Sequence, residues 1–89
     1  MQPEQAAAWS ELGHALKMQQ RYDDAVRAYQ RALDLQPTLA QAVEYLGEAY
    51  VAMGRRADAE KQLARLEPMD AALAKQLREA IATGRIAAW

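Results

Sequence analysis

One set of residues returns after 34 positions, and this period limits the possible folds more than any other feature of the sequence. Aligning residues 6–39 with residues 40–73 gives ten identities, eight of them within the first twenty positions. The leucine–glycine pair at 12–13, for example, returns at 46–47. A period of this length, with large and small residues at fixed positions, is typical of proteins built from repeated units. We therefore predict a stack of similar units.

Each unit has the pattern of two helices joined by a short connector. In the first unit, apolar residues recur at helical spacing from Pro3 to about Gln19, and again before Pro37. Pro3 suits the first turn of a helix, whereas Pro37 cannot continue one. Residues 19–21 are too few for any connection except that of an antiparallel hairpin. The first unit is thus predicted to be a helical hairpin.

Two aspartates open the predicted second helix of this hairpin. Asp23 and Asp24 fall in its first turn, where carboxylates interact favourably with the positive end of the helix dipole. We expect Asp23 to pair with Arg27, which lies four residues later on the same face.

A glycine interrupts the first helix of each unit. Such a glycine costs about 1 kcal/mol relative to alanine in a helix interior. We expect another backbone to pass close to Gly13, and by analogy to Gly47, and to offset this loss. Ala25 and Ala32 are the small residues expected to let the second helix approach the first.

The second unit repeats the first but ends sooner. We predict a helix over about 39–53, with Gly54 as the glycine that caps it. A further helix is predicted over about 57–66, and Pro68 ends it earlier than the period requires.

A fifth helix is predicted after the second unit, with Asp70 as its N-cap and Gly84 at its end. We interpret it as a cap, because stacked repeats need a terminal element with a polar outer face. The prediction is an all-α fold of five helices in one domain over 1–84, with repeat one at 6–39, repeat two at 40–69, the cap at 70–84 and a flexible tail at 85–89.

Composition excludes several classes of function. The 89 residues carry a net charge of −1, and the longest basic run is the pair Arg55-Arg56, so nucleic-acid binding is not expected. No apolar run approaches the roughly 18 residues of a membrane span. The first residues lack the basic and apolar regions of a signal peptide. With no cysteine in the chain, a cytoplasmic location is expected.

The sequence offers little for catalysis or metal binding. His14 is the single histidine, and without a cysteine or a second histidine it has no partners for a metal site. Ser10 lies one turn earlier on the same face, but no third catalytic group is evident. We predict no enzymatic activity, no cofactor and no metal.

With these features in place, the chain resembles the tetratricopeptide repeat family. The first unit carries the spaced residues of its signature: Trp9, Leu12, Gly13, Leu16, Ala25, Tyr29, Ala32 and Pro37. The second unit carries Leu46, Gly47, Tyr50 and Ala59, and departs from the pattern at Val43, Leu66 and Ala71. The resemblance covers roughly residues 6–68, and the fifth helix looks like the family's terminal solvating helix.

The resemblance implies a right-handed α-solenoid of antiparallel helix hairpins, whose first helices line a concave groove. Family members mostly hold a peptide or helix of another protein there, so a protein-interaction module is the expected function. The groove positions carried over to this sequence are Ser10, His14, Lys17, Met18, Gln41, Glu44, Tyr45, Glu48 and Ala52. The family's clamp for chaperone C-termini needs Lys and Asn where this chain has Ser10, His14 and Tyr45, so that activity is not expected.

Several side chains allow two interpretations. Glu44 and Glu48, one turn apart, form either a solvated helix face or, as a weaker hypothesis, an acidic strip for a basic partner. Family geometry places Trp9 and Tyr29 at the helix–helix interface. Met18 and Met53 are interpreted as gap-fillers near the connectors. Ile86 and Trp89 belong either to a disordered tail or to a segment that docks on an apolar surface.

The number of repeats leaves an alternative function open. Two hairpins are fewer than the roughly three repeats that usually make a stable stack. Self-association into homo-oligomers, or origin within a longer protein, could supply the missing contacts. The favoured partner is a protein or peptide; the alternative is a structural unit that binds copies of itself.

Overall fold

The computed structural model describes residues 3–85, which form five α-helices and no strand. The prediction of an all-α fold is confirmed, and helix boundaries agree with the sequence to within one or two residues. The helices are α1 (Pro3–Met18), α2 (Tyr22–Leu35), α3 (Ala40–Ala52), α4 (Arg56–Leu66) and α5 (Ala71–Thr83).

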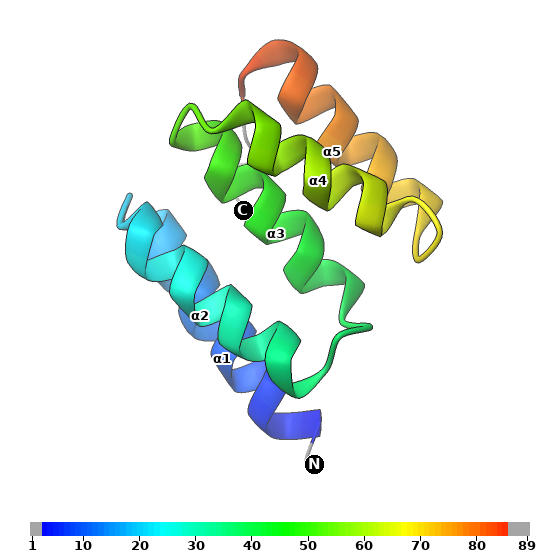
Figure 1. The fold of residues 1–89 in the computed structure, drawn as a ribbon. Coiled ribbons are helices and arrows are strands. Elements are labelled where there is room, and N and C mark those ends of the chain that lie inside the picture. Colours follow the sequence, from blue (N-terminus) through cyan, green and yellow to red (C-terminus); the bar gives the residue numbers. More distant parts are fainter. Residues whose placement is uncertain (1–2, 86–89) are drawn as a thin grey trace.

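The helices pack as two hairpins with a fifth helix at one end, which is the arrangement of an α-solenoid (Figure 1). α1 pairs with α2, and α3 pairs with α4. α2 packs against α3, while α5 packs against both α3 and α4. The Gln30 amide donates a hydrogen bond to Tyr50 Oη (3.3 Å) and thereby links the two hairpins.

The connectors of the two hairpins share one backbone design. Gln20 and Gly54, 34 residues apart, both have positive φ, at 63° and 74°. The next amide in each connector donates to a carbonyl five residues back: Arg21 N to Leu16 O at 2.9 Å, and Arg55 N to Tyr50 O at 2.8 Å. This left-handed residue with its returning hydrogen bond ends a helix by satisfying a free carbonyl.

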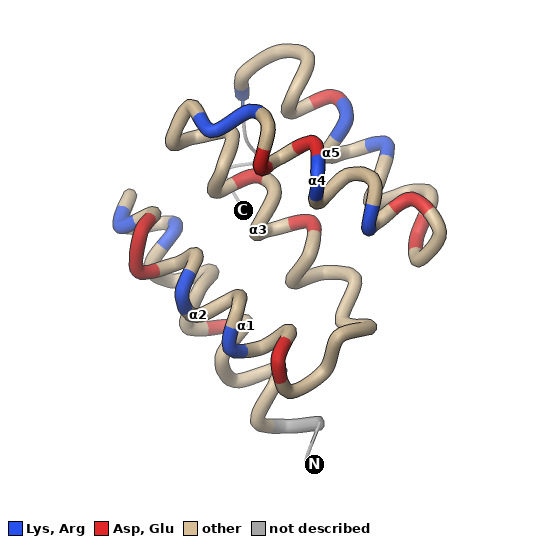
Figure 2. Tube along the Cα trace, in the orientation of Figure 1, with Lys and Arg blue, Asp and Glu red and all other residues tan. Residues whose placement is uncertain are grey.

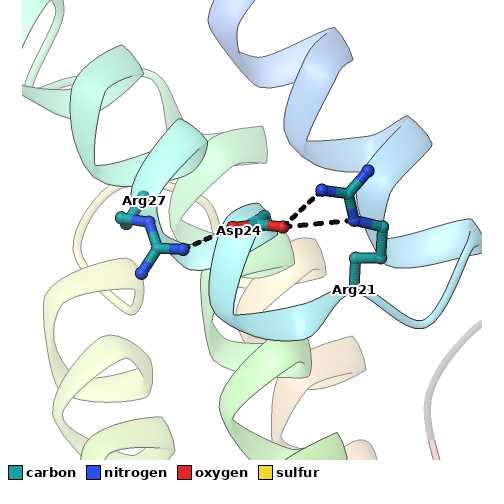
Figure 3. A network of polar contacts seen from close by, with 3 residues as sticks. All are labelled: Arg21, Asp24 and Arg27. Atoms are coloured by element: carbon teal, nitrogen blue, oxygen red, sulfur yellow. Dashed lines mark hydrogen bonds and ion pairs between the residues drawn. The ribbon is translucent and has the colours of Figure 1, made fainter.

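An aspartate early in the second helix of each hairpin binds the connector arginine. Asp24 Oδ2 accepts hydrogen bonds from Arg21 Nε (3.1 Å) and Nη2 (2.8 Å), and Asp24 Oδ1 accepts one from Arg27 (Figure 3). In the second hairpin, Asp58 accepts from Arg55 Nε at 2.8 Å. The prediction that Arg27 pairs with Asp23 was therefore wrong. The arginines, Arg27 first and then Arg21, lower the pKa of Asp24.

Both helix glycines make room for a large side chain. A Cβ at Gly13 would lie 2.7 Å from the ring of Tyr29, and a Cβ at Gly47 would lie 2.6 Å from Leu77 Cδ2. The expectation that a backbone passes close to these glycines was wrong, because the close atoms belong to side chains. Tyr29 comes from the same hairpin as Gly13, whereas Leu77 comes from α5.

α5 covers the second hairpin. Asp70 caps it by accepting a hydrogen bond from the Leu73 amide (3.0 Å), and Gly84 ends it with a φ of 70°. Ala74, Leu77 and Ala80 are buried, whereas Lys75, Arg78 and Glu79 are exposed. α5 therefore buries one face and exposes a polar face, as expected of a terminal cap.

The first hairpin has no comparable cover on its outer face within residues 3–85. Trp9 keeps 38 % of its surface exposed, so the prediction that it packs at a helix–helix interface was wrong. Met18 is exposed and does not fill a gap, whereas Met53 packs against the core. Tyr29 is fully buried, as predicted. The alternatives for Ile86 and Trp89 lie outside the described residues.

Candidate functional site

The candidate site is the surface formed by the first helix of each layer, α1, α3 and α5. These three helices run side by side: Lys17 on α1 bonds Glu48 on α3, which also bonds Gln76 on α5. The nine positions proposed for the groove all lie on α1 and α3, and the structure divides them into an open part and a closed part. The closed part consists of Lys17, Glu44 and Glu48, which are buried.

The open part is a shallow recess of about 220 Å³ between the middle of α1 and the N-terminal half of α3. Its lining is mainly apolar and consists of Ala7, Ser10, Glu11, His14, Leu39, Gln41 and Tyr45. Four of the nine groove positions meet there: Ser10, His14, Gln41 and Tyr45. Met18 and Ala52 are exposed but do not line this recess.

The closed part is held by a buried ion pair. Lys17 Nζ lies 3.2 Å from Glu48 Oε1, and each side chain is only 1 % exposed. Gln76 Nε2 donates to the other carboxylate oxygen of Glu48 at 3.3 Å. Because the three residues come from three helices, Glu48 connects all three layers. A buried pair of this kind adds little net stability, but removing one partner is strongly destabilising.

Glu44 lies one turn before Glu48 and is fully buried. Its carboxyl group lies against that of Glu48, with which it shares a hydrogen bond. Burial, followed by the neighbouring Glu48, raises the pKa of Glu44 to about 9. Its carboxyl group is therefore protonated and neutral at pH 7. These two glutamates form neither a solvated face nor an exposed acidic strip, because Glu48 is paired and Glu44 is uncharged.

Tyr45 separates the recess from the ion pair. Its ring lies 5.0 Å from that of His14 on one side, and Lys17 Nζ lies 4.9 Å from its centroid on the other. Tyr29 packs behind it, with ring centroids 5.8 Å apart. Burial, and then the nearby Glu44 and Glu48, raise the pKa of Tyr45. Tyr45 thus lies between the recess and the closed part of the site.

Comparison with known proteins gives the same family as the sequence signature. Residues 6–39 match the family model described as the tetratricopeptide repeat, and these are the residues predicted for repeat one. The match identifies residues 6–39, the first hairpin, as a tetratricopeptide repeat. No curated protein and no solved structure matches the chain.

The ion pair between Lys17 and Glu48 was not predicted from the sequence. Lys17 and Glu48 are separated by 31 residues, three fewer than the repeat period. The position equivalent to Lys17 in the second repeat is Val51, and Glu48 lies one helical turn before Val51. The sequence signal for this pair is a basic residue on the first helix of one repeat and an acidic residue on the first helix of the next repeat, offset by one turn.

Three other properties describe residues 3–85. No group of three His, Cys, Asp or Glu side chains is placed to hold a metal ion there. None of the helices in this range has both the length and the apolar character needed to cross a bilayer. Figure 2 shows basic and acidic residues interspersed along α2, α4 and α5, whereas the charged residues of α3 are both glutamates.

Proposed function

We propose that this chain is a protein-interaction module that holds a segment of a partner protein in the recess between α1 and α3. Tetratricopeptide repeats generally mediate contacts between proteins and are generally not catalytic. The observation that carries the proposal is the recess itself, in which apolar walls surround a few polar groups. Sites of this composition favour an apolar side chain while the polar groups fix its orientation.

The contacts around the recess support a particular kind of ligand. Tyr45 and His14 present aromatic surface, while Ser10 and Gln41 supply hydroxyl and amide groups. Glu11 is exposed and is the single formal charge among the lining residues. We therefore expect the partner segment to insert one apolar side chain and to carry mostly uncharged polar residues beside it.

A matched pair of substitutions tests the proposal. Ala7 and Ala64 are both exposed helical alanines, but Ala7 lines the recess and Ala64 lies on α4. Binders are first selected from a random peptide display library against the immobilised protein. Ala7→Arg fills the recess and is expected to weaken the selected peptides at least about tenfold, a loss near 1.4 kcal/mol. Ala64→Arg is expected to leave their affinity unchanged. Peptides that bind both variants equally well would place the binding surface elsewhere.

A further inference from the structure

A strip along the outer side of α1 has no cover in the described structure. Residues spaced at three and four along a helix share one face, and here these are Gln5, Ala8, Trp9, Leu12, Ala15 and Leu16, with Gln19 directly after the helix. We call this set the outer strip. It contains no charged residue. Trp9 is 38 % exposed and Leu12 is 46 % exposed, while Leu16 is half-buried.

The second repeat shows what the fold does with the same positions elsewhere. The residues equivalent to the apolar part of the outer strip, 34 positions later, are buried: Ala42, Val43, Leu46, Ala49 and Tyr50. α2 covers them, because it packs directly against α3. The outer strip is therefore a helix-packing surface without a packed helix. Its apolar residues are contiguous, unlike the single exposed apolar residues that are normal on protein surfaces.

The order of large and small residues on the strip matches a second copy in the opposite direction. If two α1 helices cross antiparallel at Leu12, each residue faces the one equally far on the other side of that centre. Trp9 then lies against Ala15 of the other copy, and the reverse contact forms by symmetry. The same combination of a large and a small residue occurs within the first hairpin, where the ring of Tyr29 packs against Gly13.

The same register satisfies the rest of the strip. Leu16 lies against Ala8 of the second copy, and Gln5 meets Gln19, so amide groups at the ends can bond to each other. A parallel arrangement would instead set Trp9 on Trp9 and leave gaps between the alanines. Antiparallel helices also bring the positive end of each helix dipole beside the negative end of the other. Shape, hydrogen bonding and charge all favour the antiparallel pair.

We propose that two copies of this chain associate through the outer strip of α1, antiparallel and centred on Leu12. The strip lies on a different side of α1 from Ser10 and His14, so the dimer leaves the recess accessible. α1 has 16 residues and is about 24 Å long. One helix pair of this length buries less than the roughly 1,600 Å² of a standard interface. The dimer is therefore weak, with a Kd in the micromolar to millimolar range.

Sedimentation velocity of the 89-residue chain over this concentration range tests the proposal. The wild type is expected to shift from monomer to dimer as concentration rises. Leu12→Glu places two carboxylates at the centre of the interface and is expected to raise the Kd more than about 100-fold. Met69→Glu is the matched control: Met69 is also exposed, at 37 %, but lies beyond α4, and its substitution is expected to leave the Kd unchanged. A wild type that stays monomeric, or equal effects of the two substitutions, overturns the proposal.

A size swap tests the direction of the pair. Ala15→Trp alone sets tryptophan against tryptophan and is expected to weaken the dimer. Adding Trp9→Ala restores one large and one small residue at each contact and is expected to recover the wild-type Kd within about threefold, since closely packed pairs are not additive. Both residues are exposed, and circular dichroism verifies that the variants remain helical. A double variant as weak as Ala15→Trp alone would overturn the antiparallel register.

Discussion

The two repeats have the same pattern of residues but different neighbouring helices, and these neighbours explain why equivalent residues pack differently. Gly13 accepts the ring of Tyr29 from its own hairpin, whereas Gly47 accepts Leu77 from the next layer. The outer side of α1 is open, while the equivalent side of α3 is covered by α2. The same helix position thus packs within a hairpin, packs between layers or stays exposed, depending on its place in the stack.

The largest expected effect concerns the link between the two repeats. Lys17→Met removes the buried cation that is paired with the Glu48 carboxylate. Because an uncompensated buried charge is costly, we expect a loss of about 3 kcal/mol in the free energy of unfolding. Urea denaturation at pH 7 measures it. Adding Glu48→Gln to Lys17→Met removes the charge and should recover at least half of the loss; no recovery would mean that the pair does not connect the repeats.

The two glycines allow a direct comparison between contacts within and between hairpins. Gly13→Ala places a Cβ against the rigid ring of Tyr29, and we expect it to destabilise by about 2 kcal/mol, even after the better helix propensity of alanine. Gly47→Ala meets the end of the Leu77 side chain, which can rotate away, so the expected loss is about 1 kcal/mol or less. Thermal unfolding of both variants ranks them. The reverse order would show that α5 is packed more rigidly than the first hairpin.

The sequence predicted those features that depend on short-range pattern. The five helices, their ends, the Asp70 cap and the glycine after α3 all follow from residues close together in the chain. Tyr29 was correctly expected to be buried because its place in the repeat fixes its neighbour. These are local rules that hold in each repeat independently of what surrounds it.

Features that depend on neighbouring layers were not predicted. Trp9 has a packing position in the repeat, but 38 % of its surface stays exposed. Glu44 and Glu48 were placed on an open groove, yet the first is buried and neutral and the second is paired with Lys17. Burial of a groove position is decided by side chains that reach across from other helices, and a repeat signature contains no information about them.

Glu44 provides a pH test of how the groove positions differ between repeats. Its equivalent in the first repeat is Ser10, which carries no charge at any pH used here. The folded-state pKa of Glu44, about 9, lies above the ordinary value of 4.5. A raised pKa means that stability is fully present below pH 4.5 and is lost as pH rises toward 9.

Glu44→Gln keeps the shape of the neutral acid and removes this loss. We expect no gain over the wild type at pH 4, and a gain that grows by up to about 1.4 kcal/mol for each pH unit between 4.5 and 8. Urea denaturation of both proteins across this pH range measures the difference in their free energies of unfolding. The contributions of other titrating groups cancel in this difference. A constant difference at all pH values would show that Glu44 is ionised in the folded protein.

The smallest expected effect comes from the connectors. Their positive-φ position is a glutamine in the first repeat and a glycine in the second. Gln20 holds a φ of 63° that is strained for a side chain, whereas Gly54 meets the same requirement without strain. Gln20→Gly is expected to stabilise by about 0.5 kcal/mol, since relief of strain slightly exceeds the entropy that glycine loses on folding. Gly54→Gln should destabilise by about 1 kcal/mol for the converse reason.

Gln19→Gly is the control for the connector pair, because Gln19 is also exposed and does not have positive φ. It introduces glycine entropy without relieving strain, so it should destabilise by a few tenths of a kcal/mol. Thermal unfolding at a single protein concentration compares all three variants. If Gln20→Gly and Gln19→Gly were equally destabilising, the glutamine connector would be unstrained, and the two hairpins would differ in their packing but not in their turns.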